Sequence, residues 1–145
     1  MAVAAPDVEK LAIRVRRSTM RLRRRLRTEF PSGLSQTDYS ALSSVVREGR
    51  VGFGVLAEIE SIKPPSMTRI ATALEQRGLV TRQVDPHDRR RASLEATPAG
   101  RRLVEDNRRQ RDAYLATALR RLPARDLVTL DRATAVLERV LERRR

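Results

Sequence analysis

The sequence contains no cysteine and no tryptophan, and it has one histidine among 145 residues. The lack of cysteine excludes disulfide bonds, thiolate metal sites and thiol-based redox switches. The single histidine, His87, leaves little material for a catalytic dyad or a histidine-rich metal site. The chain also has no Gly-rich phosphate loop and no convincing pair of carboxylates. We therefore predict no catalytic residues, no metal, no cofactor and no enzymatic activity.

Aromatic residues make up 3% of the sequence, so the core has to be built from Leu, Val, Ile and Ala, a composition that favours helices. The length of 145 residues is enough for one domain with a genuine core. No apolar run approaches the length of a membrane-spanning helix, and the first ten residues lack the features of a secretory signal peptide. We expect a soluble, cytoplasmic protein without a membrane partner.

Basic residues number 31 against 18 acidic ones, which gives a net charge of +13. Such an excess points to a polyanionic partner, nucleic acid before an anionic membrane surface. Nearly all of the cations are arginine, since lysine occurs only at Lys10 and Lys63. Arginine pairs with phosphate and guanine through two hydrogen bonds, but the same bias can reflect a GC-rich genome.

Two prolines, Pro64 and Pro65, suit the first turn of a predicted helix that ends near Gly78. Residues at helical spacing predict a buried side of this helix, namely Met67, Ile70, Ala71, Ala73 and Leu74. The other side presents small hydroxyls and an arginine, at Ser66, Thr68, Arg69 and Thr72. Such a helix is suited to enter a DNA major groove. An ordinary amphipathic surface helix has the same pattern, so both interpretations remain open.

Capping residues and apolar spacing predict the other elements. In chain order these are a helix after Asp7, a helix from Ser35 to Gly49, an extended stretch at 50–53, a short helix at 55–60, strands at 79–84 and 91–96, a helix from Thr97 to about Arg121 and a last helix after Pro123. Two strands joined by a basic turn, directly after a helix that could read DNA, predict a wing.

Both terminal helices have an apolar stripe. Its members are Val8, Leu11, Val15, Leu22 and Leu26 in the first helix, and Leu127, Leu130, Thr134, Leu137 and Leu141 in the last one. An apolar face on a terminal helix needs a partner, which is either a second copy of the chain or the first helix of the same chain. The first helix also has an arginine stripe (Arg14, Arg17, Arg21 and Arg24), which is either a solvated face or a DNA contact.

The third and fourth predicted helices fit a helix-turn-helix. Leu56, Ile62, Met67 and Ile70 have the spacing at which the two helices interlock, and Ala57 is small enough for their close approach. Two residues depart from the usual pattern: Glu60 replaces an apolar residue, and Ser61 replaces the glycine of the turn. A positive φ at Ser61 would be mildly strained.

The segments LAEIESIKPPSMTRIATALEQRGLV and DPHDRRRASLEATPAG resemble the winged helix-turn-helix of the MarR transcriptional regulators. The most specific features are PPSMTRI, the RGLV step, and the D-x-R sequence before a Thr-Pro helix start. The order of helices extends the resemblance over the whole chain. Lys63 departs from the Ser or Thr that is usual before the two prolines, so a helix cap is missing there, although a lysine could contact a phosphate.

The resemblance implies a mainly α fold with a small β-hairpin wing, in which N- and C-terminal helices form a homodimer. It implies one MarR-like domain over 1–145, with a DNA-binding lobe at 35–98 and dimerisation regions at 1–34 and 99–145. The expected interface residues belong to the two apolar stripes: Val8, Leu11, Val15, Leu127, Leu130, Leu137 and Leu141.

The homodimer would bind double-stranded DNA at a palindromic operator, with half-sites about one helical turn (~10 bp) apart. On the fourth helix the candidate contacts are Lys63, Pro65, Ser66, Thr68, Arg69 and Thr72, together with the first-turn N–H groups. On the wing, Arg90 matches the family's minor-groove arginine and Asp88 its orienting carboxylate, with Arg89 and Arg91 at the backbone. A solvated basic turn is the alternative interpretation of the wing.

Members of this family most often repress transcription and commonly release DNA when a small aromatic or phenolic acid binds. Phe30, Tyr39 and Tyr114 could line a pocket for such an effector or could be ordinary packing residues. The alternative function is that of a nonspecific nucleoid-associated or RNA-binding basic protein. Its binding would depend steeply on salt and hardly on sequence.

Overall fold

The computed structural model describes residues 6–84 and 92–142, so Asp88, Arg89, Arg90 and Arg91 lie outside the described residues. The chain divides into two compact units, Met1–Arg108 and Arg109–Arg145. The described elements are α1 (Val8–Glu29), α2 (Gln36–Glu48), β1 (Val51–Gly52), α3 (Phe53–Glu60), α4 (Pro64–Gln76), β2 (Val80–Val84), β3 (Ala92–Ala96), α5 (Pro98–Leu119) and α6 (Ala124–Glu142). The predicted fold class, mainly α with a small sheet, is confirmed.

The first two helices begin at the capping residues that the sequence predicts. The Asp7 carboxylate accepts hydrogen bonds from the backbone N–H groups of Glu9 and Lys10 at 3.0 and 3.1 Å. The bond from Lys10 is the main reason why the pKa of Asp7 lies below its ordinary value. Ser35 caps α2 by accepting a 3.1 Å hydrogen bond from the backbone N–H of Asp38. Both caps satisfy donors that the first turn of a helix leaves unpaired.

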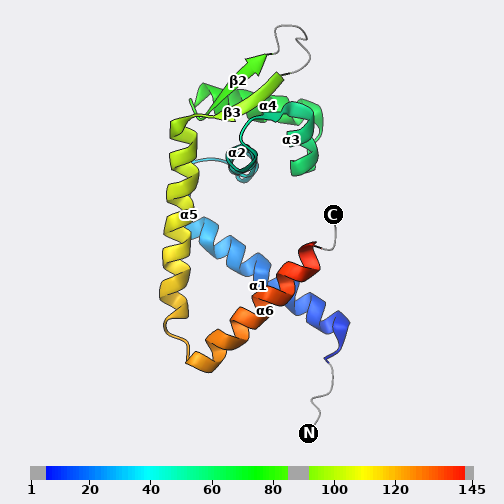
Figure 1. The fold of residues 1–145 in the computed structure, drawn as a ribbon, viewed down its shortest axis with the longest axis vertical. Helices are drawn as coiled ribbons and strands as arrows, with labels where there is room; N and C mark the ends of the chain where they lie inside the picture. Colours follow the sequence, from blue (N-terminus) through cyan, green and yellow to red (C-terminus); the bar gives the residue numbers. More distant parts are fainter. Residues whose placement is uncertain (1–5, 85–91, 143–145) are drawn as a thin grey trace. The chain divides into compact units, whose positions relative to one another are not determined.

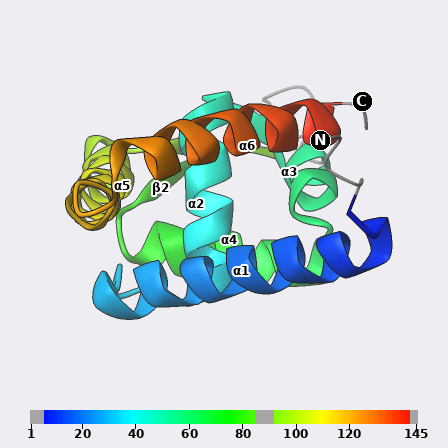
Figure 2. The same cartoon turned by 90° about the horizontal axis from the view of Figure 1, so that it is seen from below.

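A hydrophobic core joins α2, α3, α4 and the sheet. α2 runs through the middle of this lobe, and α3 and α4 pack beside it and against each other (Figure 1, Figure 2). The largest fully buried side chains are Leu42, Val45, Leu56, Met67, Ile70, Leu74, Val80 and Leu94. Burial of this apolar surface is the main favourable contribution to folding. The buried side predicted for α4 is confirmed, except that Ala73 is only half-buried.

The wing strands belong to a three-stranded antiparallel sheet in the order β1-β3-β2. β2 and β3 pair along their length, beginning with Val80 opposite Ala96, which confirms the predicted pair of strands. β1 lies on the other edge of β3, where Val51 pairs with Leu94. The sequence predicts an extended stretch there but not its pairing, because two residues are too few for an alternating pattern.

The start of α5 is fixed to the turn between α4 and β2. The Thr97 hydroxyl donates a 2.7 Å hydrogen bond to the Gly78 carbonyl and accepts one of 3.1 Å from the backbone N–H of Gly100. A Cβ atom on Gly100 would lie 2.1 Å from the carbonyl oxygen of Leu79. Glycine is therefore required at this close approach between helix and turn.

Two helix ends differ from the predicted ones. α3 begins at Phe53 rather than at residue 55, because Gly52 has the extended backbone of an N-cap residue (φ −69°, ψ 151°). α5 ends at Leu119 rather than near Arg121. The N–H groups of Arg121 and Leu122 donate to carbonyls three residues earlier, so the chain turns here before the next helix.

The second unit contains the end of α5 and the whole of α6. The Pro123 carbonyl accepts hydrogen bonds from the N–H groups of Asp126 at 2.9 Å and Leu127 at 3.3 Å, so α6 starts directly after this proline, as predicted. α6 has no buried residue. Within residues 6–84 and 92–142, no helix is both long and apolar enough to cross a membrane.

Candidate nucleic-acid interface

The turn between α3 and α4 has the geometry of a Schellman helix end. The N–H of Ser61 donates to the Glu58 carbonyl at 3.1 Å, and the N–H of Ile62 donates to the Ala57 carbonyl at 2.9 Å. Ser61 is in the left-handed region (φ 53°, ψ 42°), and among the described residues it is the one non-glycine with positive φ. The positive φ considered for Ser61 is thus found, and serine bears steric strain there that glycine would not.

Glu60, which replaces the usual apolar residue of the helix-turn-helix, is half-buried and hydrogen-bonded. The hydroxyl of Ser44 on α2 donates to Glu60 Oε1 at 2.5 Å. Arg47 Nη2 donates to the same hydroxyl at 3.3 Å, and Ser44 is 4% exposed. The hydrogen bond from Ser44 therefore offsets the cost of half-burying the Glu60 carboxylate, and it connects the end of α3 to α2.

The first two turns of α4 present an exposed polar surface. Ser66, Thr68 and Arg69 are exposed, whereas Met67 and Ile70 beside them are buried. The N-cap residue Lys63 and the first-turn Pro65 are exposed as well, and no side chain caps this helix end. Hydroxyl and guanidinium groups on such a surface can bond to base edges and phosphates.

The start of α4 offers fewer free N–H donors than predicted. Pro64 and Pro65 have no N–H, and the N–H groups of Ser66 and Met67 donate to the Lys63 carbonyl at 3.0 and 3.1 Å. The predicted phosphate contact of the first-turn N–H groups therefore has few free donors to support it and stays a prediction. Side chains and the helix dipole remain as means of attracting a phosphate to this end.

Thr72 differs from the other α4 candidates because its hydroxyl also accepts a hydrogen bond from another element, whereas the Thr68 hydroxyl donates within α4, to the Pro64 carbonyl at 3.2 Å. Thr72 Oγ1 donates to the Thr68 carbonyl at 3.0 Å, and Arg82 Nη2 on β2 donates to Thr72 Oγ1 at 3.4 Å. Thr72 is half-buried. It therefore lies between α4 and the wing strand rather than on the exposed polar surface.

Known proteins share both the sequence of this lobe and the order of its elements. Residues 34–92 match the model of the MarR family. The chain is 38% identical over 111 residues to the HTH-type transcriptional regulator Mb0904 of Mycobacterium bovis, and the match covers 76% of this chain and 78% of that protein. The chain belongs to the MarR family. It is a transcriptional regulator of the MarR type, in a family of regulators rather than of enzymes.

Further proteins resemble it at lower identity. The HTH-type transcriptional repressor MdtR of Bacillus subtilis is 28% identical over 110 residues, which cover 76% of this chain and 71% of that protein. A MarR family protein from Bacillus stearothermophilus superposes with a TM-score of 0.78 at 22% identity, over 95% of this chain and 99% of that chain. NadR in complex with 4-hydroxyphenylacetate superposes with a TM-score of 0.60 at 24% identity, over 94% and 96%. Both superpositions concern the fold alone.

The terminal helices of this MarR protein carry the two predicted apolar stripes on their surfaces. Neither α1 nor α6 contains a buried residue. Large apolar side chains exposed in this number are typical of an interaction surface. Of the predicted interface residues, Val8, Leu11, Leu127, Leu130 and Leu141 are exposed, and Val15 and Leu137 are half-buried.

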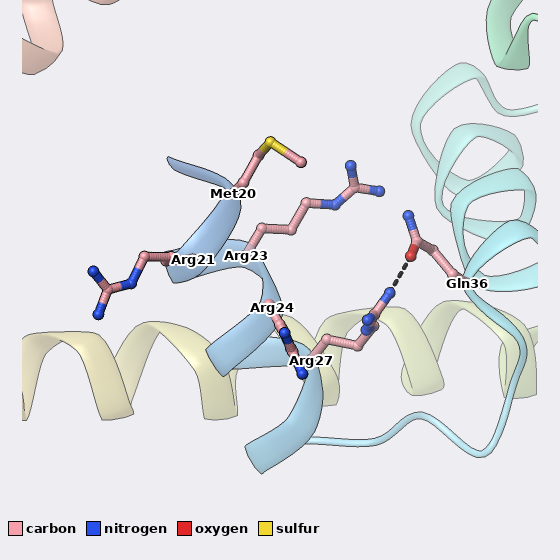
Figure 3. A pocket seen from close by; sticks show the side chains of 6 residues that line it. All are labelled: Met20, Arg21, Arg23, Arg24, Arg27 and Gln36. Atoms are coloured by element: carbon pink, nitrogen blue, oxygen red, sulfur yellow. Dashed lines mark hydrogen bonds between the residues drawn. The ribbon is translucent and has the colours of Figure 1, made fainter. Parts of the chain in front are cut away.

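A hollow of about 360 Å³ lies beside the C-terminal half of α1 in this MarR protein (Figure 3). Across it the Arg27 guanidinium donates to the side-chain oxygen of Gln36. None of the aromatic residues considered from the sequence lines it. Arginine side chains suit an anion, and no three His, Cys, Asp or Glu side chains in the described residues gather as a metal site. The lining residues are Met20, Arg21, Arg23, Arg24, Arg27 and Gln36.

Sequence reasoning missed Arg82, the residue that connects the wing strand to the helix-turn-helix of this MarR lobe. Its guanidinium carbon is 4.9 Å from the centroid of the Phe53 ring, and its Nε is 3.5 Å from Glu75 Oε2. Alternation could have revealed it: Arg82 follows the buried Val80 by two residues and so lies on the same face of β2. A charged residue on the core side of a strand needs partners.

Proposed function

We propose that this MarR regulator is a sequence-specific double-stranded DNA-binding repressor that acts in the cytoplasm as a homodimer on a palindromic operator. The observation that carries the proposal is that α4 has one buried apolar side and one exposed polar side. Its buried side, with Met67 and Ile70, is anchored in the core, while Ser66, Thr68 and Arg69 are exposed. A helix presented in this way fits the major groove, which is about 12 Å wide.

In this proposal the lobe at 35–98 reads DNA, and the segments at 1–34 and 99–145 form the dimer. The exposed apolar stripes of α1 and α6 support the second part, because a self-complementary pair of subunits would remove them from water. A two-fold pair presents its two α4 helices to successive major grooves, about 10 bp apart.

We assign the contacts on α4 by side-chain chemistry. Arg69 has the donors to bind guanine N7 and O6 together. Ser66 and Thr68 would bond to neighbouring base edges or phosphates, and Lys63 and Pro65 would meet the backbone at the helix start. Thr72 is left out of this set, because it is half-buried and its hydroxyl accepts a hydrogen bond from Arg82.

The wing would add a minor-groove contact. In the D-x-R sequence that resembles the family pattern, Arg90 would enter the groove, Asp88 would orient it, and Arg89 and Arg91 would meet phosphates. A narrow, A·T-rich minor groove attracts an inserted arginine through its negative potential.

We also propose that a small aromatic or phenolic acid relieves repression. MdtR is a repressor, and NadR binds 4-hydroxyphenylacetate in its crystal structure. The hollow beside α1 supports an acidic ligand, because its arginines could pair with a carboxylate and Met20 could contact an aromatic ring. To release DNA, the ligand has to bind one spacing of the two α4 helices better than the other.

Selection of bound duplexes from random DNA tests the main proposal. We expect an inverted repeat with half-sites about 10 bp apart, bound by two copies of the chain. If no motif is enriched and binding to every duplex falls steeply with salt, a charge-driven nucleoid-associated or RNA-binding protein is favoured instead. A monomer at working concentrations would contradict the dimer.

Substitution of Arg69 by Ala tests the reading helix. We expect a loss of about 1–3 kcal/mol of operator binding and a relaxed preference at one base position. The control is Arg102→Ala, which removes an exposed arginine of α5 outside the lobe. If Arg69→Ala weakens binding equally on all sequences, Arg69 contacts a phosphate instead.

Substitution of Arg90 by Ala tests the wing. Operator affinity should fall substantially, whereas the melting temperature and the dimer should be unchanged, because only a groove contact is lost. Fluorescence anisotropy with a labelled operator at moderate salt gives the affinity. An unchanged affinity would remove the wing from the proposal.

A further inference from the structure

Arg82 joins three elements of the lobe through one guanidinium group. From β2 it stacks over Phe53, the first residue of α3, at 4.9 Å from the ring centroid. On α4 its Nη2 donates to Thr72 Oγ1 at 3.4 Å, and its Nε is 3.5 Å from Glu75 Oε2. The Arg82 side chain is 30% exposed, so it is mostly enclosed by these partners.

The three contacts together require arginine. Arg82 Nε is buried and has no hydrogen-bond partner among the described residues. The nearby Glu75 carboxylate therefore stabilises the guanidinium charge electrostatically. The planar guanidinium can stack on a ring while the N–H groups on its edge face acceptors. A lysine has the charge but neither the plane nor the fork, so it could not make all three contacts at once.

The contacts form a path from the wing strand to the exposed surface of α4. Arg82 bonds to Thr72, and Thr72 bonds one helical turn back to the Thr68 carbonyl. Thr68 itself belongs to the exposed polar surface of α4. In the other direction β2 continues from Arg82 to Val84, the last residue before the predicted wing tip. Arg82 therefore lies between the two parts of the lobe proposed to touch DNA.

We propose that Arg82 is a positioning residue that fixes the wing strand against α4 and thereby sets the separation at which the two reach DNA. The inference deepens the proposed function and rests on it, since it names a residue that acts on DNA reading without contacting DNA. Its loss should weaken binding by letting β2 and β3 move relative to α4.

The first test uses the free protein. In Arg82→Gln, amide hydrogen exchange of β2 and β3 should be about tenfold faster than in the wild type, because local opening becomes easier. The matched control is Arg50→Gln, which removes an exposed arginine bonded to Ser93 of the same sheet at 2.9 Å. That control should leave β2 exchange unchanged. Unchanged exchange in Arg82→Gln would overturn the proposal.

The second test measures binding to the selected operator as a function of salt. Arg82→Gln should lose about tenfold in affinity with the same salt slope as the wild type. A direct phosphate contact would instead lower the slope by about 0.9, and that result would overturn a positioning role. Arg82→Lys keeps the charge and should stay as weak as Arg82→Gln. Full rescue by lysine would show that charge alone matters.

A double-mutant cycle with Arg90→Ala completes the test. Once the wing contact is absent, the position of the wing matters little, so adding Arg82→Gln should cost less than about threefold. Fully additive losses would overturn the proposal, because Arg82 would then act independently of the wing. If the wild-type protein selects no operator, the proposed function fails, and the exchange comparison alone decides whether Arg82 fixes the wing strand to α4.

Discussion

The winged lobe and helix α1 differ sharply in charge. Residues 35–98 contain nine basic and eight acidic residues, a formal charge of +1, whereas α1 contains nine basic and two acidic residues, a formal charge of +7. More than half of the chain's +13 thus lies on one helix outside the lobe that we propose reads DNA. Net charge indicates a polyanionic partner, but it does not indicate which surface recognises a sequence.

The two regions also differ in how their arginines are held. In the lobe, Arg77 donates to the Gly33 carbonyl at 2.8 Å, Arg50 to Ser93 at 2.9 Å and Arg82 to Thr72 at 3.4 Å. On α1 every basic residue is exposed, and its arginines bond to positions nearby in the chain: Arg25 pairs with Glu29 at 3.2 Å and Arg27 donates to Gln36. Arginines bonded to distant parts of the chain can define a geometry, while the dense exposed charge of α1 contributes a field that salt screens within about 8 Å. We infer that the lobe supplies specificity and α1 supplies long-range attraction.

The largest predicted effect concerns the junction between the start of α5 and the lobe, which does not involve α1. In Gly100→Ala the new Cβ would lie 2.1 Å from the Leu79 carbonyl oxygen, so the start of α5 has to move off the turn. We expect a loss of about 3 kcal/mol in the free energy of unfolding. Chemical denaturation followed by circular dichroism measures it. Gly54→Ala is the control, since a Cβ there meets nothing within 4 Å, and equal stability of both variants would contradict the tight junction.

The second prediction compares the loss of four arginines on α1 with the loss of Arg69 on α4. Replacing Arg14, Arg17, Arg21 and Arg24 of α1 by Gln should change operator affinity at physiological salt by less than about threefold, because screening removes a distant field. At low salt, binding to unrelated duplexes should fall about tenfold. Arg69→Ala should instead lower operator affinity at physiological salt and leave binding to unrelated duplexes at low salt nearly unchanged. If the fourfold variant loses the sequence preference, α1 takes part in recognition and the comparison fails.

The parts of this fold that depend on neighbouring residues were predictable. The caps at Asp7, Ser35 and Thr97 and the buried side of α4 follow from spacings of two to four residues, and they are found, with Ala73 the one residue of that side that is only half-buried. Local chemistry fixes them, because a cap or an amphipathic face needs no distant partner.

Features that need a distant partner were missed. Glu60 looked like a departure from the pattern until the structure placed the Ser44 hydroxyl, sixteen residues earlier, 2.5 Å from it. Thr72 has a side chain that suits a DNA contact, and nothing in the sequence indicates that Arg82, ten residues later, donates to its hydroxyl. Neither separation has a periodic signature in one sequence, so both pairings had to come from the tertiary structure.

A third prediction concerns the turn that connects α3 to α4. Ser61→Gly should stabilise the lobe by about 1 kcal/mol, because glycine adopts the left-handed conformation (φ 53°) without a Cβ clash. The same substitution at Ser43, inside α2, should destabilise by about 0.5–1 kcal/mol. Thermal unfolding of the two variants measures both changes. If Ser61→Gly destabilises the lobe, the serine side chain adds more to the free energy of unfolding than its backbone strain takes away.

The smallest predicted effect concerns pH and contrasts the caps of α1 and α2. Hydrogen bonds from Lys10 and Glu9 hold the folded pKa of Asp7 below its ordinary value of 3.8, so the cap stabilises the first turn above that value and is lost as pH falls through the folded pKa. Ser35 does not titrate in this range. The protection factor of the Glu9 amide, which corrects the exchange rate for its intrinsic pH dependence, should therefore fall as pH falls through the folded pKa. The protection factor of Asp38 should not acquire this dependence. Asp7→Ser would place a hydroxyl at the same position and should abolish the pH dependence at α1, and a persistent dependence in that variant would assign it to another group.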